Sequence, residues 1–93
     1  MDAATDAGIQ RAVAVLTAAG AREVYLFGSV ARGTMRDDSD VDIAVVGLPP
    51  QWYYRAVAEL GDVFGRPVDL IDLDESNAFT RYLKSEGELR RVG

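Results

Sequence analysis

Histidine and cysteine are both absent from the 93 residues of this chain. Their absence excludes disulfide bonds, a thiolate nucleophile, an imidazole base and the soft ligands that zinc prefers. Any catalysis therefore has to use carboxylates, hydroxyls, arginine and lysine. Hard oxygen ligands favour Mg²⁺ or Mn²⁺ over Zn²⁺, and the phosphate groups of a substrate commonly complete such a coordination shell.

Positive charge and long apolar runs are also scarce. Ten Lys and Arg residues stand against fifteen Asp and Glu residues, which gives a formal net charge of −5 at pH 7. Because a nucleic-acid surface needs clustered Lys and Arg, this balance argues against nucleic acid as a partner and favours a protein or a small molecule. The N-terminus has no basic start or apolar run, and no segment approaches membrane-spanning length. We therefore expect a cytoplasmic protein with no membrane association.

The length and composition predict one small globular domain. Hydrophobic residues make up 48% of the chain and charged residues 27%, a balance typical of folded proteins. A chain of this size buries about 60 to 65% of its unfolded surface. We expect a single domain over residues 1–93, with no room for the separate substrate domain of a template-directed polymerase.

Hydrophobic periodicity predicts alternating helices and strands. The expected helices cover residues 6–19, 51–64 and 76–86, with a short helical piece at 29–32, and the expected strands cover residues 23–27, 41–46 and 67–73. Three strands separated by helices predict an α+β fold in which a small mixed sheet has helices packed on it. The aromatic run Trp52, Tyr53 and Tyr54 has two interpretations, core packing or a docking surface for a partner.

The most informative pattern couples a glycine turn to two carboxylates. Gly28 and Ser29 are followed, after a spacer of ten residues, by the pair Asp40 and Asp42. Alternation along the strand directs both carboxylates to one face and Ile43 to the other, into a core. At roughly 3.3 Å per residue the Cα atoms of the pair lie about 6.6 Å apart, so their side chains can converge on a shared pair of cations.

This pattern resembles the signature of nucleotidyltransferases of the polymerase-β type, which is Gly-Ser, a spacer of ten residues and Asp-x-Asp. The extended form, Gly-Ser-x-Ala-Arg-Gly with Ser-Asp-x-Asp, resembles the minimal nucleotidyltransferases in particular. The matching residues are Gly28, Ser29, Ala31, Arg32, Gly33, Ser39, Asp40 and Asp42. The resemblance extends from about Glu23 to the C-terminus, and it implies a polymerase-β palm-like fold with a third carboxylate on a later strand. Asp69 stands in that setting, whereas Asp72 should face the opposite side of the strand.

The resemblance implies in-line attack of an acceptor hydroxyl on the α-phosphorus of a nucleoside triphosphate, with pyrophosphate as the leaving group. Backbone N–H groups of Gly28 and Ser29, together with the Ser29 hydroxyl, would hold the β- and γ-phosphates. Asp40, Asp42 and Asp69 would hold two Mg²⁺ ions, with Mn²⁺ as the alternative. Asp69 would also accept the proton of the acceptor hydroxyl.

Three other polar residues near the motif have two interpretations each. Arg32 and Arg36 either stabilise the triphosphate or belong to a solvated surface. Ser39 either contacts the nucleotide or shapes the turn before the Asp-x-Asp pair. Two rival motifs fail, because Thr34 replaces the lysine that a P-loop requires and Ile43 replaces the glycine that an EF-hand loop requires.

The resemblance also implies a partner. The chain is similar to antitoxins whose cognate toxin is a HEPN-domain ribonuclease, which implies transfer of AMP from ATP to a tyrosine hydroxyl of that toxin, together with binding to it. Two alternatives stay open: a non-catalytic antitoxin that masks its partner through residues 51–64 and the C-terminal segment, or transfer to a small molecule or an RNA end. The nucleotide preference and the oligomeric state are also open, since the tail could cap the core or pair with another subunit.

Overall fold

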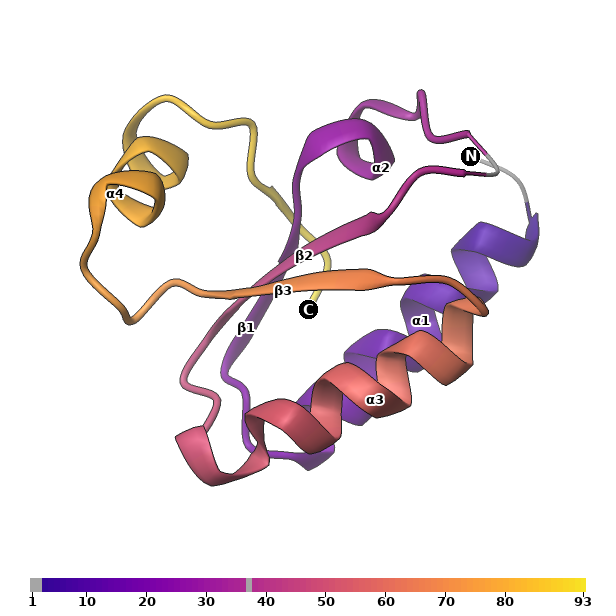
Figure 1. The fold of residues 1–93 in the computed structure, drawn as a ribbon, viewed down its shortest axis with the longest axis horizontal. Helices are drawn as coiled ribbons and strands as arrows, with labels where there is room; N and C mark the ends of the chain where they lie inside the picture. Colours follow the sequence, from indigo (N-terminus) through magenta and orange to yellow (C-terminus); the bar gives the residue numbers. More distant parts are fainter. Residues whose placement is uncertain (1–2, 37) are drawn as a thin grey trace.

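The computed structural model describes residues 3–36 and 38–93 (Figure 1). Within these residues the chain forms four α-helices, one 3₁₀ helix and four strands. In chain order they are α1 (Ala3–Ala18), β1 (Glu23–Leu26), α2 (Gly28–Arg32), β2 (Val41–Val46), the 3₁₀ helix η1 (Pro50–Trp52), α3 (Tyr53–Phe64), β3 (Val68–Asp72), α4 (Ala78–Ser85) and β4 (Arg90–Arg91). None of the helices in this described part is long and apolar enough to cross a membrane.

The strands form one mixed sheet in the order β3-β2-β1-β4. Strand β1 pairs antiparallel with β2 and with β4, whereas β2 and β3 run parallel. A parallel pair needs a crossover connection, which explains why the helix α3 separates β2 from β3 in the sequence. The expected α+β fold, a small mixed sheet with helices packed on it, is confirmed.

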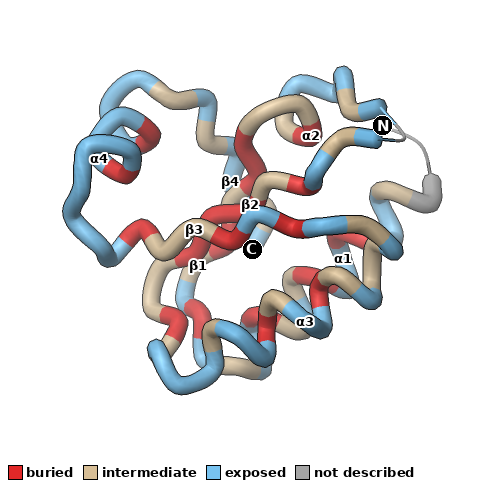
Figure 2. Tube along the Cα trace, viewed as in Figure 1, coloured by how far each residue is buried: buried red, intermediate tan, exposed pale blue. Residues whose placement is uncertain are grey.

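The larger hydrophobic core lies between one face of the sheet and the helices α1 and α3, which pack together (Figure 1). In both helices the buried residues recur at helical spacing, which gives each an apolar stripe toward the sheet. The buried members of this core from α1, α3 and the strands include Ile9, Ala12, Leu16, Ala56, Leu60, Val24, Leu26, Val41, Ile43, Val45, Val68 and Leu70. Figure 2 shows these elements with their buried segments toward the centre of the molecule. The predicted inward direction of Ile43 is confirmed.

The opposite face of the sheet is covered by α4 over only part of its area (Figure 1). The buried cluster on this face consists of Phe27, Ala44, Leu73 and Leu83. Alternation along β2 and β3 places Asp42 on the same face as Ala44, and Asp69 on the same face as Ile71. Asp69 is exposed and Asp42 is half-buried. This face therefore leaves both carboxylates accessible to a ligand.

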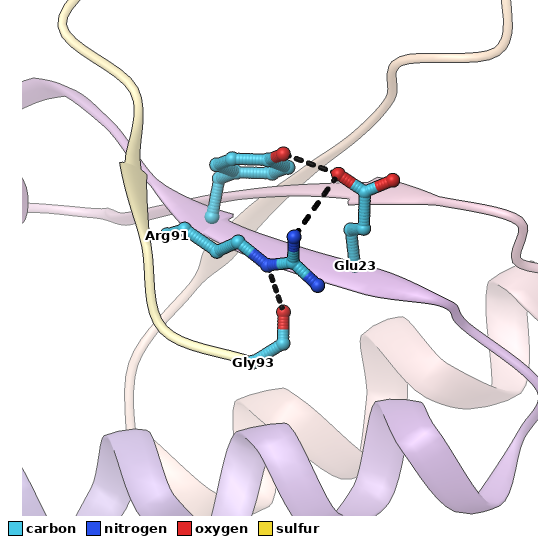
Figure 3. Close-up of polar contacts among 4 residues, drawn as sticks. Glu23, Arg91 and Gly93 are labelled. Atoms are coloured by element: carbon cyan, nitrogen blue, oxygen red, sulfur yellow. Dashed lines mark hydrogen bonds and ion pairs between the residues drawn. The ribbon is translucent and has the colours of Figure 1, made fainter.

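The sequence does not predict β4, which forms the edge of the sheet beside β1. Its two arginines pair with Tyr25 and Leu26. Figure 3 shows the Arg91 guanidinium between the carboxylate of Glu23, at 3.8 Å, and the carbonyl of Gly93, to which it donates a hydrogen bond of 3.1 Å. The last residues of the chain thus lie along the edge of the sheet, where Val92 packs against the larger core. Two charged residues carry no alternation, so periodicity could not reveal this strand.

The aromatic run at the start of α3 divides between core and surface. Tyr53 is half-buried, and its hydroxyl donates a hydrogen bond to the Leu70 carbonyl. Trp52 is 42% exposed and Tyr54 is 83% exposed. Core packing therefore accounts for Tyr53, and the other two rings belong to the surface.

Two helices begin later than the sequence analysis expects. Helix α3 starts at Tyr53 and not at residue 51, because Pro50 begins a 3₁₀ turn that precedes it. Helix α4 starts at Ala78 and not at residue 76, because Asn77 is its N-cap. The Asn77 side chain accepts a 2.9 Å hydrogen bond from the Thr80 N–H. A 3₁₀ turn sets the first boundary and an N-cap sets the second, and the apolar spacing sets neither.

Candidate active site

The backbone at Gly28 lies directly against the carboxylate of Asp42. Gly28 begins α2 with a φ of +64°, after Phe27 in an extended conformation. A Cβ atom at this position would stand 2.2 Å from Asp42 Oδ2 and 3.2 Å from Asp42 Cγ. Glycine is therefore required at this position for two reasons: the backbone is left-handed, and the Asp42 carboxylate lies too close for a side chain. The two halves of the sequence pattern meet at this contact, with Ser29 half-buried in the first turn of α2.

Asp42 and Asp69 lie side by side on neighbouring strands. They are register partners in the parallel pair of β2 and β3. Burial, the charge of Asp69, a hydrogen bond with Asp69 and the charge of Asp40 raise the pKa of Asp42 from 3.8 to about 6, against an opposing effect of Arg32. The three carboxylates therefore occupy one region of the molecule.

The oxygen atoms available in this region suit a hard divalent cation. They are carboxylate oxygens whose mutual repulsion contributes to the raised pKa of Asp42, and a bound cation would relieve that repulsion. Among the described residues, no three acidic side chains are grouped closely enough to form a metal site as they stand. Asp42 and Asp69 are in contact, whereas Asp40 is exposed in the loop before β2. Asp42 and Asp69 fit as the first ligands, and Asp40 would have to turn toward them to complete the set.

The loop before Asp40 is held by hydrogen bonds. The Ser39 N–H donates to the Arg36 carbonyl, and the Arg36 N–H donates to the Ser39 hydroxyl, each at 3.0 Å. This geometry favours the turn-shaping interpretation of Ser39. Arg66, which the sequence analysis does not single out, donates from Nη1 to the carbonyls of Arg36 at 2.8 Å and Ser39 at 3.3 Å. Because Arg66 precedes β3, it ties the loop that carries Asp40 to the strand that carries Asp69.

A cavity of 300 Å³ adjoins the contact between Gly28 and Asp42. One side of it belongs to the region just described, and the other side is formed by α4 and the turn that follows. The residues that line it are Phe27, Gly28, Arg32, Asp42, Phe79, Tyr82, Leu83, Glu86, Gly87 and Glu88. A ligand in this cavity would have one end beside the carboxylates and the other beside the aromatic residues of α4.

The sequence matches a known family over most of its length. Residues 16–89 match the family model described as polymerase beta, nucleotidyltransferase. The chain belongs to the polymerase-β nucleotidyltransferase family. Among curated proteins, no relative matches this nucleotidyltransferase.

Solved structures similar to this nucleotidyltransferase include toxin–antitoxin complexes. A toxin–antitoxin structure with AMP-PNP has a TM-score of 0.72 and 25% identity, over 87% of this chain and 70% of the other. A protein described as a minimal nucleotidyltransferase has a TM-score of 0.75 and 24% identity, over 96% and 91% of the two chains. A complex of the tri-AMPylated Shewanella oneidensis HEPN toxin with its MNT antitoxin has a TM-score of 0.66 and 21% identity, over 90% and 69%. At these identities the last two establish the shared fold.

In this nucleotidyltransferase the structure brings together four of the residues expected at the site: Gly28, Arg32, Asp42 and Asp69. Arg32 lines the cavity and acts on the Asp42 carboxylate, whereas Arg36 does not line the cavity. The rival third carboxylate, Asp72, accepts a 2.8 Å hydrogen bond from the Asp74 N–H in the turn after β3. Asp72 is the last residue of β3 and the register partner of Val45, so Asp69, not Asp72, lies beside Asp42 as expected.

Arg66→Ala is expected to lower the rate of nucleotidyl transfer by about 10- to 100-fold, the usual effect of losing a residue that positions a metal ligand. Since the Arg66 guanidinium donates to two carbonyl groups, its loss frees the loop that carries Asp40. The Mg²⁺ concentration that gives half-maximal rate should therefore rise. Steady-state transfer rates, measured at a series of Mg²⁺ concentrations for wild type and Arg66→Ala, would test this prediction.

The controls for this prediction separate loop position from charge. Arg66→Lys keeps the charge and a hydrogen-bond donor but not the planar guanidinium, so it should recover part of the rate. Arg55→Ala removes an exposed arginine of α3 and should leave the rate and the Mg²⁺ dependence unchanged. Wild-type Mg²⁺ dependence in Arg66→Ala would show that Arg66 does not position Asp40.

Proposed function

We propose that this chain is a Mg²⁺-dependent nucleotidyltransferase that transfers AMP from ATP to a tyrosine hydroxyl of a HEPN ribonuclease and thereby acts as its antitoxin. The observation that carries the proposal is the contact of the Gly28 backbone with the Asp42 carboxylate, beside Asp69. Support also comes from the family, from the similar toxin–antitoxin structure with AMP-PNP, and from the similar fold of the antitoxin bound to a tri-AMPylated HEPN toxin.

In this proposal Asp40, Asp42 and Asp69 hold the metal ions. Bound Mg²⁺, or Mn²⁺ in its place, would neutralise the charge that develops on the transferred phosphoryl group and favour ionisation of the acceptor hydroxyl. At neutral pH the Asp42 carboxyl is mostly ionised, because its pKa of about 6 lies below that pH. The raised pKa is therefore compatible with a role as a ligand.

The remaining residues bind the triphosphate and accept a proton. Backbone N–H groups of Gly28 and Ser29 would contact the β- and γ-phosphates, and Arg32 would place its charge beside them. The tyrosine oxygen forms a bond to the α-phosphorus as the bond from that phosphorus to the β-phosphate oxygen breaks, and pyrophosphate leaves. Asp69 accepts the tyrosine proton. Its exposure on the open face of the sheet allows a residue of another protein to reach it.

The proposal assigns the whole active site to one domain over residues 1–93. The site residues that the structure brings together come from the strands β2 and β3 of one sheet and from α2, the helix that follows β1.

We also propose a cytoplasmic location. An RNA-cleaving partner would place both proteins in the cytoplasm, where its RNA substrate is found.

A second candidate is an antitoxin that masks its partner without chemistry. The exposed ring of Trp52 favours it, since this ring borders a 310 Å³ groove between α1 and α3 and lies under the Arg55 guanidinium at 5.7 Å. Partly exposed apolar surface of this kind is a common site of protein contact. The two candidates differ in whether neutralisation of the partner requires the Asp42 carboxylate.

Incubation of the protein with ATP, Mg²⁺ and the HEPN ribonuclease that we expect a neighbouring gene to encode should add AMP to a tyrosine of that ribonuclease. Intact-mass and peptide mass spectrometry would detect the adduct, and a chelator should prevent it. Asp42→Asn should form no adduct. If the partner is neutralised equally by wild type and by Asp42→Asn, and no adduct forms on any acceptor, the masking candidate replaces the proposed one.

A further inference from the structure

Two exposed aromatic side chains of α4 face the candidate active site across the 300 Å³ cavity. Phe79 is 46% exposed and Tyr82 is 53% exposed. They are three residues apart, which places them on one side of the helix. Leu83, buried in the cluster beneath α4, anchors that helix to the sheet. Both rings therefore expose part of their surface at the edge of the cavity.

The position of these rings is fixed relative to the glycine turn. The Phe79 ring packs edge-to-face on the Phe27 ring, with centroids 6.1 Å apart and an interplanar angle of 66°. Phe27 is the residue immediately before Gly28, so the ring contact ties α4 to the start of α2. Thr80, which is 2% exposed, donates from its hydroxyl to the Glu75 carbonyl at 2.6 Å and holds the first turn of α4. Phe79 and the first turn of α4 are thus held beside the proposed phosphate site.

The charged residues around the cavity differ between its two sides. Arg32 lies on the side of Gly28 and Asp42, whereas Glu86 and Glu88 lie on the side of α4. The two glutamates would repel a triphosphate, whereas Arg32, together with the Mg²⁺ that Asp42 would share with the substrate in the proposed function, would attract it, so the phosphates should lie at the Gly28 side. Carboxylates accept hydrogen bonds from amino groups, which nucleobases carry. The wall formed by α4 therefore suits the nucleoside end of the substrate.

We propose that Phe79 and Tyr82 form the surface on which the base of the nucleoside triphosphate stacks. This inference rests on the proposed nucleotidyltransferase function, and it names the residues that bind the nucleoside moiety. The cavity is at the lower end of the size range of small-molecule sites, which suits one nucleoside whose phosphates extend along its Gly28 side. Aromatic side chains bind bases through their π-faces, and this contact is sensitive to loss of the ring.

The test compares a ligand that has a base with one that lacks it. Binding of AMP-PNP and of inorganic tripolyphosphate, each with Mg²⁺, is measured by calorimetry for wild type, Phe79→Ala and Tyr82→Ala. We expect each variant to bind AMP-PNP about tenfold more weakly, as is usual for loss of a stacked ring, and to bind tripolyphosphate as wild type does. Tyr54→Ala, which removes a ring 83% exposed on α3, is the matched control and should bind both ligands normally.

A second substitution at Phe79 separates loss of the aromatic ring from loss of packing. Phe79→Leu keeps apolar contact with Phe27 but has no ring, so it should retain the fold and still bind AMP-PNP more weakly. Unchanged AMP-PNP binding in Phe79→Ala and Tyr82→Ala would overturn the inference while leaving the proposed function intact. The inference also fails if these variants lose only their binding to a partner protein, or if they lose both ligands equally. Failure of wild type to bind AMP-PNP at all would overturn the proposed function itself.

Discussion

Gly28→Ala is expected to reduce nucleotidyl transfer by on the order of 100-fold, the cost of displacing a reacting group by about 1 Å. The new methyl group would stand 2.2 Å from Asp42 Oδ2, so either the carboxylate or the glycine turn has to move. A movement of either one separates the proposed metal ligands from the proposed phosphate site. The substitution also costs about 1 to 2 kcal/mol because φ is +64°. Transfer rates and thermal unfolding measured on the same samples would separate the two effects.

Gly65→Ala provides a closely matched control. Gly65 ends α3 with a φ of +65°, and no atom lies within 4 Å of the position that a Cβ would take. This variant should therefore lose a similar amount of stability without losing transfer. If Gly65→Ala and Gly28→Ala have equal rates, backbone strain alone would explain the loss and the contact with Asp42 would have no catalytic meaning.

Asp42→Asn is expected to abolish measurable transfer, a loss of at least about 100-fold, because the proposed function places the Asp42 charge directly at the reacting centre. The same substitution should not destabilise the fold when a chelator is present. Burial and the neighbouring Asp69 and Asp40 carboxylates disfavour the ionised form of Asp42, as its raised pKa indicates. Asparagine carries no such charge. Asp62→Asn, on the exposed side of α3, is the control for removal of a carboxylate elsewhere.

The pKa of Asp42 also predicts how the stability difference depends on pH. Between its ordinary value of 3.8 and its folded value of about 6, the folded state binds more protons than the unfolded state at this group. Stability from this group is therefore full below about pH 4 and is lost as the pH rises through about 6. The unfolding temperature of Asp42→Asn should consequently rise relative to wild type between these pH values in chelator.

Addition of Mg²⁺ should stabilise wild type more than Asp42→Asn. A clear drop in unfolding temperature for Asp42→Asn in chelator, at neutral pH, would indicate a structural role.

The local parts of the site could be predicted because they depend on short-range geometry. Strand β2 was expected over residues 41–46 and covers Val41–Val46. Alternation then determines that Ile43 enters the core while Asp42 faces away from it. The family resemblance implied a third carboxylate on a later strand, and Asp69 stands in the strand expected over residues 67–73, which the structure pairs in parallel with β2.

The parts that the sequence did not predict depend on contacts between distant segments. Strand β4 exists because its backbone completes the edge of β1, and its two arginines carry no periodic signal. Arg66 acts through the carbonyl groups of another loop, which no spacing rule describes. The place of α4 beside Gly28 depends on the packing of Phe79 against Phe27, two aromatic residues that in the sequence indicate only burial.

A crystal structure with Mn²⁺ and AMP-PNP, using the anomalous scattering of manganese, tests the central claim most directly. We expect manganese in contact with the carboxylates of Asp42 and Asp69, with Asp40 turned toward it, and the β- and γ-phosphates at Gly28 and Ser29. Manganese or nucleotide bound elsewhere, with the three carboxylates left without a metal, would contradict the claim that they form one metal site beside the glycine turn.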